Sequence, residues 1–298
     1  MLAKATSSRI FTIKEVMIPL LAHPKVAFVL KWTVYIWLFV NFAFYVQDDM
    51  LALRSSLPED ASLEDIILTF ATSIDVAAWL ILIAVFELET YALEDHLFTQ
   101  WLNRLFFLVK IVCYGAIAYA AYGYLDDTLE LYQLNPLGYL ADLCSLAGQG
   151  LSIQLDAALY EDITAASCQS FAAGTEFYQI VGQTTVVSAP GLQELRTMGS
   201  LDLANAVVWI VVVILIDVEV HLHNADKFGS RQLTFVRQFK TFGYLLLIGA
   251  CATWLAYGYA LYTWDAFLWI FGFWAIELNL AEWEEERVEE LEKQATQA

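Results

Sequence analysis

The chain has 298 residues, of which 59% are hydrophobic and 16% are charged. A soluble domain is usually about 45–50% apolar and about 25% charged, so the composition excludes an ordinary water-soluble fold and predicts an integral membrane protein. The formal net charge of −19 excludes a nucleic-acid-binding protein, because that class needs a basic surface to meet the phosphates.

Residues 1–25 precede the first long apolar stretch and carry Lys4, Arg9, Lys14 and Lys25. They lack the charged, apolar and small-residue regions, in that order, of a cleaved signal peptide. We therefore expect a short amphipathic segment on the cytoplasmic surface of the membrane.

Apolar stretches long enough to cross the bilayer as helices follow, since about 30 Å of hydrocarbon needs roughly 20 residues. There are six, at residues 27–47, 66–88, 105–124, 203–220, 242–262 and 265–281. Consecutive pairs give three helical hairpins, at residues 26–96, 97–227 and 228–281. The prediction is an all-α integral membrane protein with six transmembrane helices.

Basic residues between these stretches predict the orientation. One side carries the cations of the N-terminal segment together with Arg104, Lys227, Arg231 and Arg237. The opposite side carries only Arg54 and Arg196. The positive-inside rule then places both termini in the cytoplasm, and a bacterial inner membrane is the expected setting.

The one long connection, residues 125–200, is expected outside the cytoplasm. It holds nine acidic residues and several short apolar runs, so we expect a small, mostly helical cap rather than a linker. Cys144 and Cys168 both lie in it. On the oxidising side of a membrane, two such cysteines are predicted to form a disulfide.

Residues 282–298 form an acidic, helix-prone C-terminal segment. We expect a cytoplasmic helix that continues the sixth span, with a solvated charged face favoured over a partner site.

The even-numbered spans share one spacing. An aspartate or asparagine is followed by tryptophan four residues later, and by acidic or amide residues at positions twelve and fourteen. The sets are Asp75, Trp79, Glu87 and Glu89; Asn205, Trp209, Asp217 and Glu219; and Asp265, Trp269, Glu277 and Asn279. The odd-numbered spans each place a tyrosine four residues after a lysine, as Lys31–Tyr35, Lys110–Tyr114 and Lys240–Tyr244. This repeat predicts three pseudo-symmetric hairpins of like orientation about an axis along the membrane normal.

The outer residues of the repeat have two interpretations. For Asp75, Asn205 and Asp265, capping of the outer helix end is favoured over ligand binding. For Trp79, Trp209 and Trp269, packing near the membrane interface is favoured over an aromatic ring that lines a central vestibule.

The inner carboxylates Glu87, Asp217 and Glu277 lie about 18 Å along each helix from its predicted outer start. A carboxylate at that depth is costly unless it is paired, protonated or facing water. The repeated lysine and tyrosine of each hairpin are the expected partners. Such clusters either lock the hairpins together or form a carboxylate ring that selects cations or relays protons, tuned by those partners.

The second acids, Glu89 and Glu219, are matched by neutral Asn279 in the third hairpin. His221 and His223 follow Asp217 and Glu219 at i, i+4 spacing. A metal site at these histidines is a weaker interpretation than a solvated helix end.

Phosphate-binding loops, nucleophile elbows and zinc-protease motifs do not occur in the sequence, so neither an enzyme nor a cofactor is expected. The leading prediction is a channel or transporter for cations or protons that uses the repeated carboxylates. The alternative is a non-catalytic scaffold or accessory subunit of a larger membrane complex. The expected partners are the lipid bilayer and the cations or protons, with a homo-oligomer or membrane-complex partner left open.

Overall fold

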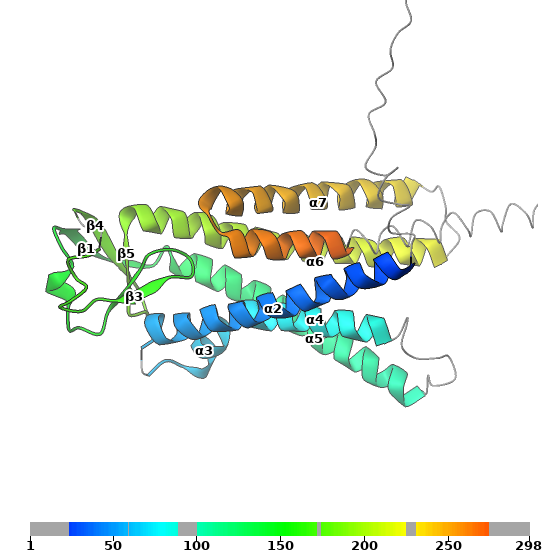
Figure 1. Ribbon diagram of the computed structural model, residues 1–298, viewed down its shortest axis with the longest axis horizontal. Helices are drawn as coiled ribbons and strands as arrows, with labels where there is room; N and C mark the ends of the chain where they lie inside the picture. The colour runs from blue at the N-terminus through cyan, green and yellow to red at the C-terminus, as the bar shows by residue number, and fades with distance from the viewer. Residues whose placement is uncertain (1–23, 59, 89–99, 172–173, 225–230, 274–298) are drawn as a thin grey trace, which may run out of the picture.

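The computed structural model describes residues 24–58, 60–88, 100–171, 174–224 and 231–273. Its long helices are α2 (Pro24–Ser56), α4 (Ala71–Glu87), α5 (Gln100–Glu130), α6 (Ala189–Asn224) and α7 (Arg231–Tyr257). The short α3 (Leu63–Thr69) precedes α4, and residues 260–273 form a further helix after α7. The helices make an elongated bundle with a small sheet at one end (Figure 1).

The helices have the length and composition of membrane spans. Within the described residues, four helices are each long and apolar enough to cross a membrane: α2, α5, α6 and α7. Helices α3 and α4 are bent by 62° relative to each other. Together they are long and apolar enough to form a broken span or a re-entrant loop. The sixth predicted stretch, residues 265–281, runs past the last described residue. The described part of the chain is therefore mostly helical, with four or five candidate spans.

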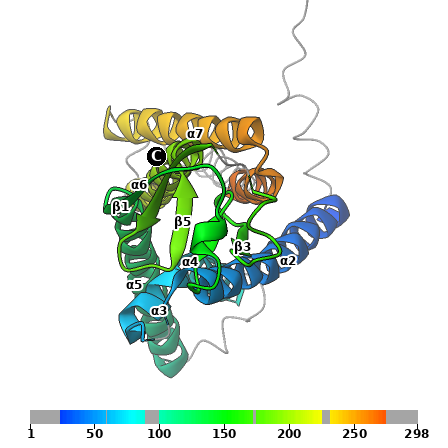
Figure 2. The ribbon, with the colours of Figure 1, turned by 90° about the vertical axis from the view of Figure 1, so that its left-hand side faces the viewer.

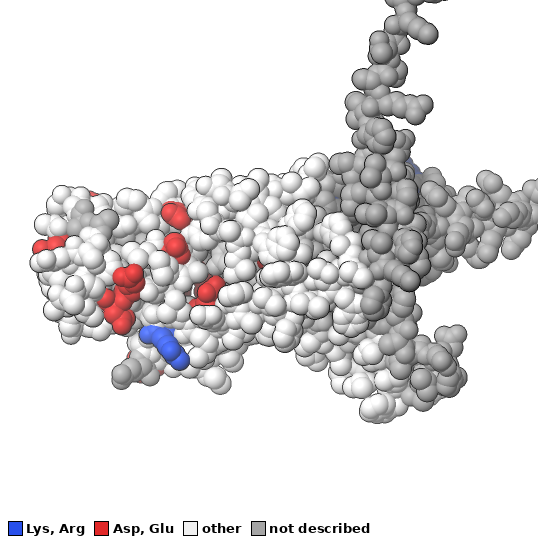
Figure 3. Space-filling model, in the orientation of Figure 1, with Lys and Arg blue, Asp and Glu red and all other residues white. Residues whose placement is uncertain are grey.

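The outer surface of the bundle is apolar. Large side chains such as Phe39, Phe107 and Leu245 are more than 60% exposed. A broad belt of this surface is free of charged atoms in the view of Figure 3, whereas acidic atoms gather at the sheet end. Such a surface suits lipid, where helices satisfy their own backbone hydrogen bonds.

Several helices exceed the length that a bilayer requires. Helix α6 has 36 residues and so extends about 54 Å, against about 30 Å of hydrocarbon. It begins at Ala189, directly after the last strand. The bundle therefore continues into the sheet end without a flexible linker.

The closest helix pairs are α4 with α5 and α6 with α7, followed by α5 with α6 and α2 with α4. The first two pairs join different predicted hairpins, and their contacts are more extensive than those within the first and second hairpins. Close approach needs small residues. At the α6–α7 crossing, a Cβ atom on Gly243 would lie only 2.6 Å from the Val212 side chain.

The segment between α5 and α6 folds as a five-stranded sheet, and the expected mostly helical cap over residues 125–200 is wrong. The strands are β1 (Leu134–Leu140), β2 (Ser152–Gln154), β3 (Tyr160–Asp162), β4 (Thr175–Ile180) and β5 (Thr185–Ser188). Their order is β1-β4-β5-β2-β3. All neighbours are antiparallel except β2 and β5, which are parallel. Seen from this end, the sheet lies across the helix ends (Figure 2).

The predicted disulfide between Cys144 and Cys168 is confirmed, with Cα atoms 4.8 Å apart. It covers a small apolar core in which Leu143, Phe177 and Val186 are fully buried. A sheet of such short strands has little core of its own, so a covalent link between its loops compensates.

Hydrogen bonds attach the sheet to the bundle. The Thr184 N–H donates to the Ser56 carbonyl at the end of α2, at 2.8 Å. Arg196 on α6 donates twice, at 3.0 and 3.1 Å, to the carbonyl of Leu131 in the short connection between α5 and β1. The sheet is thus fixed to the end of α2, and its connection to α5 is fixed to α6.

Candidate functional site: a buried polar cavity

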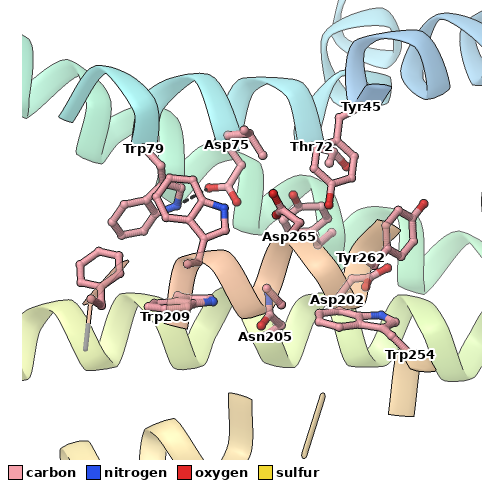
Figure 4. Close-up of a pocket in the computed structure, with 15 residues that line it drawn as sticks. Tyr45, Thr72, Asp75, Trp79, Asp202, Asn205, Trp209, Trp254, Tyr262 and Asp265 are labelled. Carbon is pink, nitrogen blue, oxygen red and sulfur yellow. Dashed lines mark hydrogen bonds between the residues drawn. The ribbon is translucent and has the colours of Figure 1, made fainter. Parts of the chain in front are cut away.

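The bundle holds a partly open cavity of about 120 Å³. Its lining comes from α2, α4, α5, α6, α7 and residues 260–273. Three carboxylates face it, from Asp75 on α4, Asp202 on α6 and Asp265 on the last described helix (Figure 4). They are joined by the amide of Asn205 and the hydroxyl of Thr72.

Two of the carboxylates are held by neighbouring donors. The Trp79 indole N–H donates to Asp75 at 3.1 Å. The Asn41 amide donates to Asp265 at 2.9 Å, and Asn41 is only 1% exposed. These bonds hold the carboxylates in place but supply no positive charge.

One polar atom of the lining also lacks a partner. The Asn205 Oδ1 atom is buried without a donor, whereas the Trp254 indole N–H faces the Asp202 carboxylate. Trp254 lies beside Asp202 (Figure 4) and is 4% exposed. Since buried polar atoms in proteins are nearly always paired, the Asn205 oxygen is an available acceptor in the lining.

Aromatic rings line the end of the cavity that lies farther from the sheet than the carboxylates. Trp79 lies 6.2 Å from Trp269 between ring centroids, and Trp209 lies 5.0 Å from Phe273. Phe273 also contacts Trp79 and Trp269. All three tryptophans of the repeated spacing therefore meet around one phenylalanine.

Tyrosines line the end of the cavity toward the sheet. The Tyr45 and Tyr262 rings are 5.9 Å apart between centroids, and Tyr124 lies near both Asp75 and Asp202. Each hydroxyl can donate a hydrogen bond to a carboxylate or accept one from a guest. The cavity is thus polar at the end toward the sheet and aromatic at the end away from it.

Further acids lie between the cavity and the sheet. Asp49, near the end of α2, accepts hydrogen bonds from the Ser73 N–H at 3.0 Å and from the Ser73 hydroxyl at 2.6 Å. Asp127 and Asp156 lie near Tyr160 on β3. Burial raises the pKa of the Tyr160 hydroxyl above its usual range, and these negative charges add to the effect. The approach from the sheet is accordingly electronegative.

The favoured capping role of Asp75, Asn205 and Asp265 is wrong. Helix α4 begins at Ala71 with Phe70 at its N-cap, α6 begins at Ala189, and the last helix begins at residue 260. The three residues therefore lie inside their helices and line the cavity. The paired tryptophans line it as well, as the vestibule alternative expected.

Of the predicted inner residues, Glu219 is described, and it lies in a buried ion cluster. It forms an ion pair with Lys240 and a second one with Arg237, at 2.8 Å. Glu219 and Lys240 are 3% and 6% exposed. Lys240 was expected to pair within its own hairpin, but this contact joins α7 to α6, because these two helices pack side by side.

The other predicted inner residues are described only in part. Glu89, Glu277 and Asn279 lie outside the described residues, as do the side chains of Glu87, Asp217, His221 and His223. Tyr244 packs edge-on against Trp209, with ring centroids 6.5 Å apart, and Tyr35 packs in the same apolar cluster. Lys31 lies on α2, and Lys110 and Tyr114 lie on α5.

Sequence reasoning missed Asp202, Tyr45 and Trp254. The sequence held one indication of Asp202, because Asp202 and Asn205 are three residues apart and so share a helix face. The predicted fourth span began at residue 203, which left Asp202 in the flanking loop. Tyr45 and Trp254 belong to no repeated spacing.

Comparisons with known proteins give no further guide. No family model, no curated protein and no solved structure matches the chain. The site is therefore interpreted from its own chemistry, which is a set of carboxylates, an unpaired polar atom and aromatic rings inside an apolar bundle.

Proposed function

We propose that the protein binds a cation or protons in this cavity and moves them across the membrane, as a channel or transporter. One observation carries the proposal. Carboxylates from three different helices converge on one cavity, and among the described residues its lining contains no lysine, arginine or histidine. This function is the one expected from the sequence. The proposed binding site, however, is the cavity near the sheet and not the inner carboxylates.

Electrostatics supports this assignment. A carboxylate in an apolar interior is strongly disfavoured in its charged form unless a positive charge or hydrogen bonds compensate it. Three of them around one cavity also repel one another, so protons or a bound cation must neutralise part of the charge. The electronegative approach from the sheet would raise the local cation concentration.

The proposed architecture is six transmembrane helices in three pseudo-symmetric hairpins. In that arrangement Asp75, Asn205 and Asp265 occupy equivalent positions around the axis, with the tryptophans one turn deeper. The sheet faces the outside of a bacterial inner membrane, and its disulfide fits the oxidising side. The inner carboxylates Glu87, Asp217 and Glu277 would form the exit of the pathway, with Glu219 held in its ion cluster as a clasp.

Flux in liposomes that contain only this protein tests the proposal. We expect measurable flux of protons, or of at least one cation from Na⁺, K⁺ and tetramethylammonium. Asp75→Asn, Asp202→Asn and Asp265→Asn should each reduce that flux by at least tenfold, because each removes a charge from the cavity. Glu161→Gln is the matched control, because Glu161 is an exposed carboxylate on β3.

Melting temperature and size-exclusion profile must be checked for each variant, so that lost flux is not lost folding. Unchanged flux in all three folded variants would exclude the cavity as the binding site. If Glu87→Gln, Asp217→Asn and Glu277→Gln abolished flux instead, the pathway would depend on the inner carboxylates. No flux of any tested ion would favour the scaffold or accessory-subunit alternative.

A further inference from the structure

We infer that the cation bound in this cavity is a small organic ammonium ion, held between aromatic faces and carboxylates. The inference rests on the proposed cation site and goes further by naming the chemical class of its guest. It follows from the lining of the cavity, its size and its unpaired polar atom.

The lining is dominated by rings. Tryptophans at positions 79, 209, 254 and 269, tyrosines at 45, 124 and 262, and Phe273 all border the cavity. The negative face of an aromatic ring attracts cations within about 6 Å of its centroid, and several rings together form the cages that recognise quaternary ammonium groups. Tryptophan is the most effective ring for this contact.

An inorganic cation fits this lining less well. Hard cations such as Ca²⁺ and Mg²⁺ take six or more oxygen ligands at close to 2–2.6 Å. Here the carboxylates stand on three separate helices, and aromatic rings make up much of the remaining lining (Figure 4). No group of three acidic, histidine or cysteine side chains in the described part of the chain comes together as metal ligands.

The size of the cavity agrees with a small organic ammonium ion as the guest. One water needs about 10–15 Å³ of such space, so a cavity of about 120 Å³ takes roughly eight to twelve water-sized groups. That is the scale of an ammonium group with a short chain. Asn205 Oδ1 lacks a donor, and an N–H or hydroxyl group of the guest would satisfy it.

Binding to the full chain in nanodiscs tests the inference directly. Isothermal titration in phosphate buffer at constant ionic strength compares tetramethylammonium and choline with NaCl and KCl. The neutral analogue 3,3-dimethylbutan-1-ol controls for apolar burial, because it has the shape of choline without its charge. We expect the ammonium ions to bind at least tenfold more tightly than Na⁺, K⁺ or the neutral alcohol.

Variants separate cation–π binding from general packing. Trp269→Leu should weaken ammonium binding at least fivefold, whereas Trp269→Phe, which keeps a ring, should lose less. Trp101→Leu is the control, since Trp101 is 70% exposed on the outside of α5. If Trp269→Leu fails to fold, quenching of the native tryptophan fluorescence by the ammonium ion replaces it as the readout.

The outcomes distinguish this inference from the proposed function. Carboxylate-dependent flux of protons, Na⁺ or K⁺ without ammonium binding would overturn the inference and leave the proposed function standing. Tryptophan-dependent ammonium binding without any flux would support the inferred guest and overturn transport. Equal binding of the neutral alcohol would overturn the inference, because charge would then play no part.

Discussion

At the scale of single residues, the chemistry depends on which charges have partners. Glu219, Lys240 and Arg237 carry both signs in one cluster, so their burial is compensated and their role is to hold helices together. Asp75, Asp202 and Asp265 lie beside the neutral donors Trp79, Trp254 and Asn41, in that order. The first cluster carries its own cations, whereas the second is where the proposed protons or cation would bind. This contrast locates the proposed site at the cavity.

The ion cluster gives a prediction about stability. Lys240→Met removes a cation that is 6% exposed beside Glu219, which is 3% exposed, and leaves that carboxylate with Arg237 alone. Breaking a buried pair costs about 3–5 kcal/mol, although the exposure of Arg237 should let it reorient and reduce the loss. We expect a clear drop in melting temperature of the detergent-solubilised protein.

The double variant Glu219→Gln with Lys240→Met should recover part of that loss, because it removes both charges. Arg231→Met serves as the control, since Arg231 is exposed at the start of α7. A Lys240→Met protein as stable as the parent would show that the cluster does not hold α6 to α7.

At the scale of elements, the length of the apolar stretches predicted the helices well, whereas the repeat predicted their packing partners poorly. Apolar stretches of about 20 residues have one stable form in lipid, and α2, α5, α6 and α7 occur where they were expected. Pairing is decided by surface fit, which spacing alone does not encode. The Gly243–Val212 contact illustrates this, since neither residue belongs to a repeated pattern.

That contact yields a prediction with an internal control. An added Cβ at Gly243 would lie 2.6 Å from Val212, whereas at Gly249, on the same helix, nothing lies within 4 Å. Gly243→Ala should therefore destabilise the α6–α7 pair by about 1–3 kcal/mol through overpacking. Gly249→Ala should be neutral, or stabilising by up to about 1 kcal/mol from helix propensity. Thermal unfolding of both variants measures the difference, and equal melting temperatures would contradict the close packing.

The sheet shows why the extramembrane segment was mispredicted. Its strands β2 and β3 have three residues each, too few for an alternating pattern to stand out. The run from Ile153 to Tyr160 resembles a helix in composition, yet Asp156 accepts hydrogen bonds from the Ala158 and Leu159 N–H groups and closes a turn. Gly148, Gly150, Gly174 and Gly182, all with positive φ, were the available sign of turns.

At the scale of the whole molecule, the repeated spacing located the site residues but not their role. Asp75, Asn205 and Asp265 were singled out from sequence, and capping was favoured because their helices were taken to start there. The helices begin earlier, α4 at Ala71, α6 at Ala189 and the last one at residue 260. Residues expected at a helix end therefore lie inside the bundle, where a carboxylate faces a cavity instead of solvent. For α6, the earlier start follows from its direct continuation from strand β5.

The position of the sheet relative to the membrane gives the last prediction. The disulfide and the distribution of basic residues both favour the sheet on the outside. In a background with Cys113→Ala and Cys251→Ala, which leaves the disulfide intact, Glu161→Cys should react with a maleimide that cannot cross the membrane when it is added from outside. Arg231→Cys, at the opposite end of the bundle, should react only after the membrane that holds the protein is opened. The reverse pattern would invert the topology, and the electronegative approach to the cavity would then face the cytoplasm and draw its cation from inside the cell.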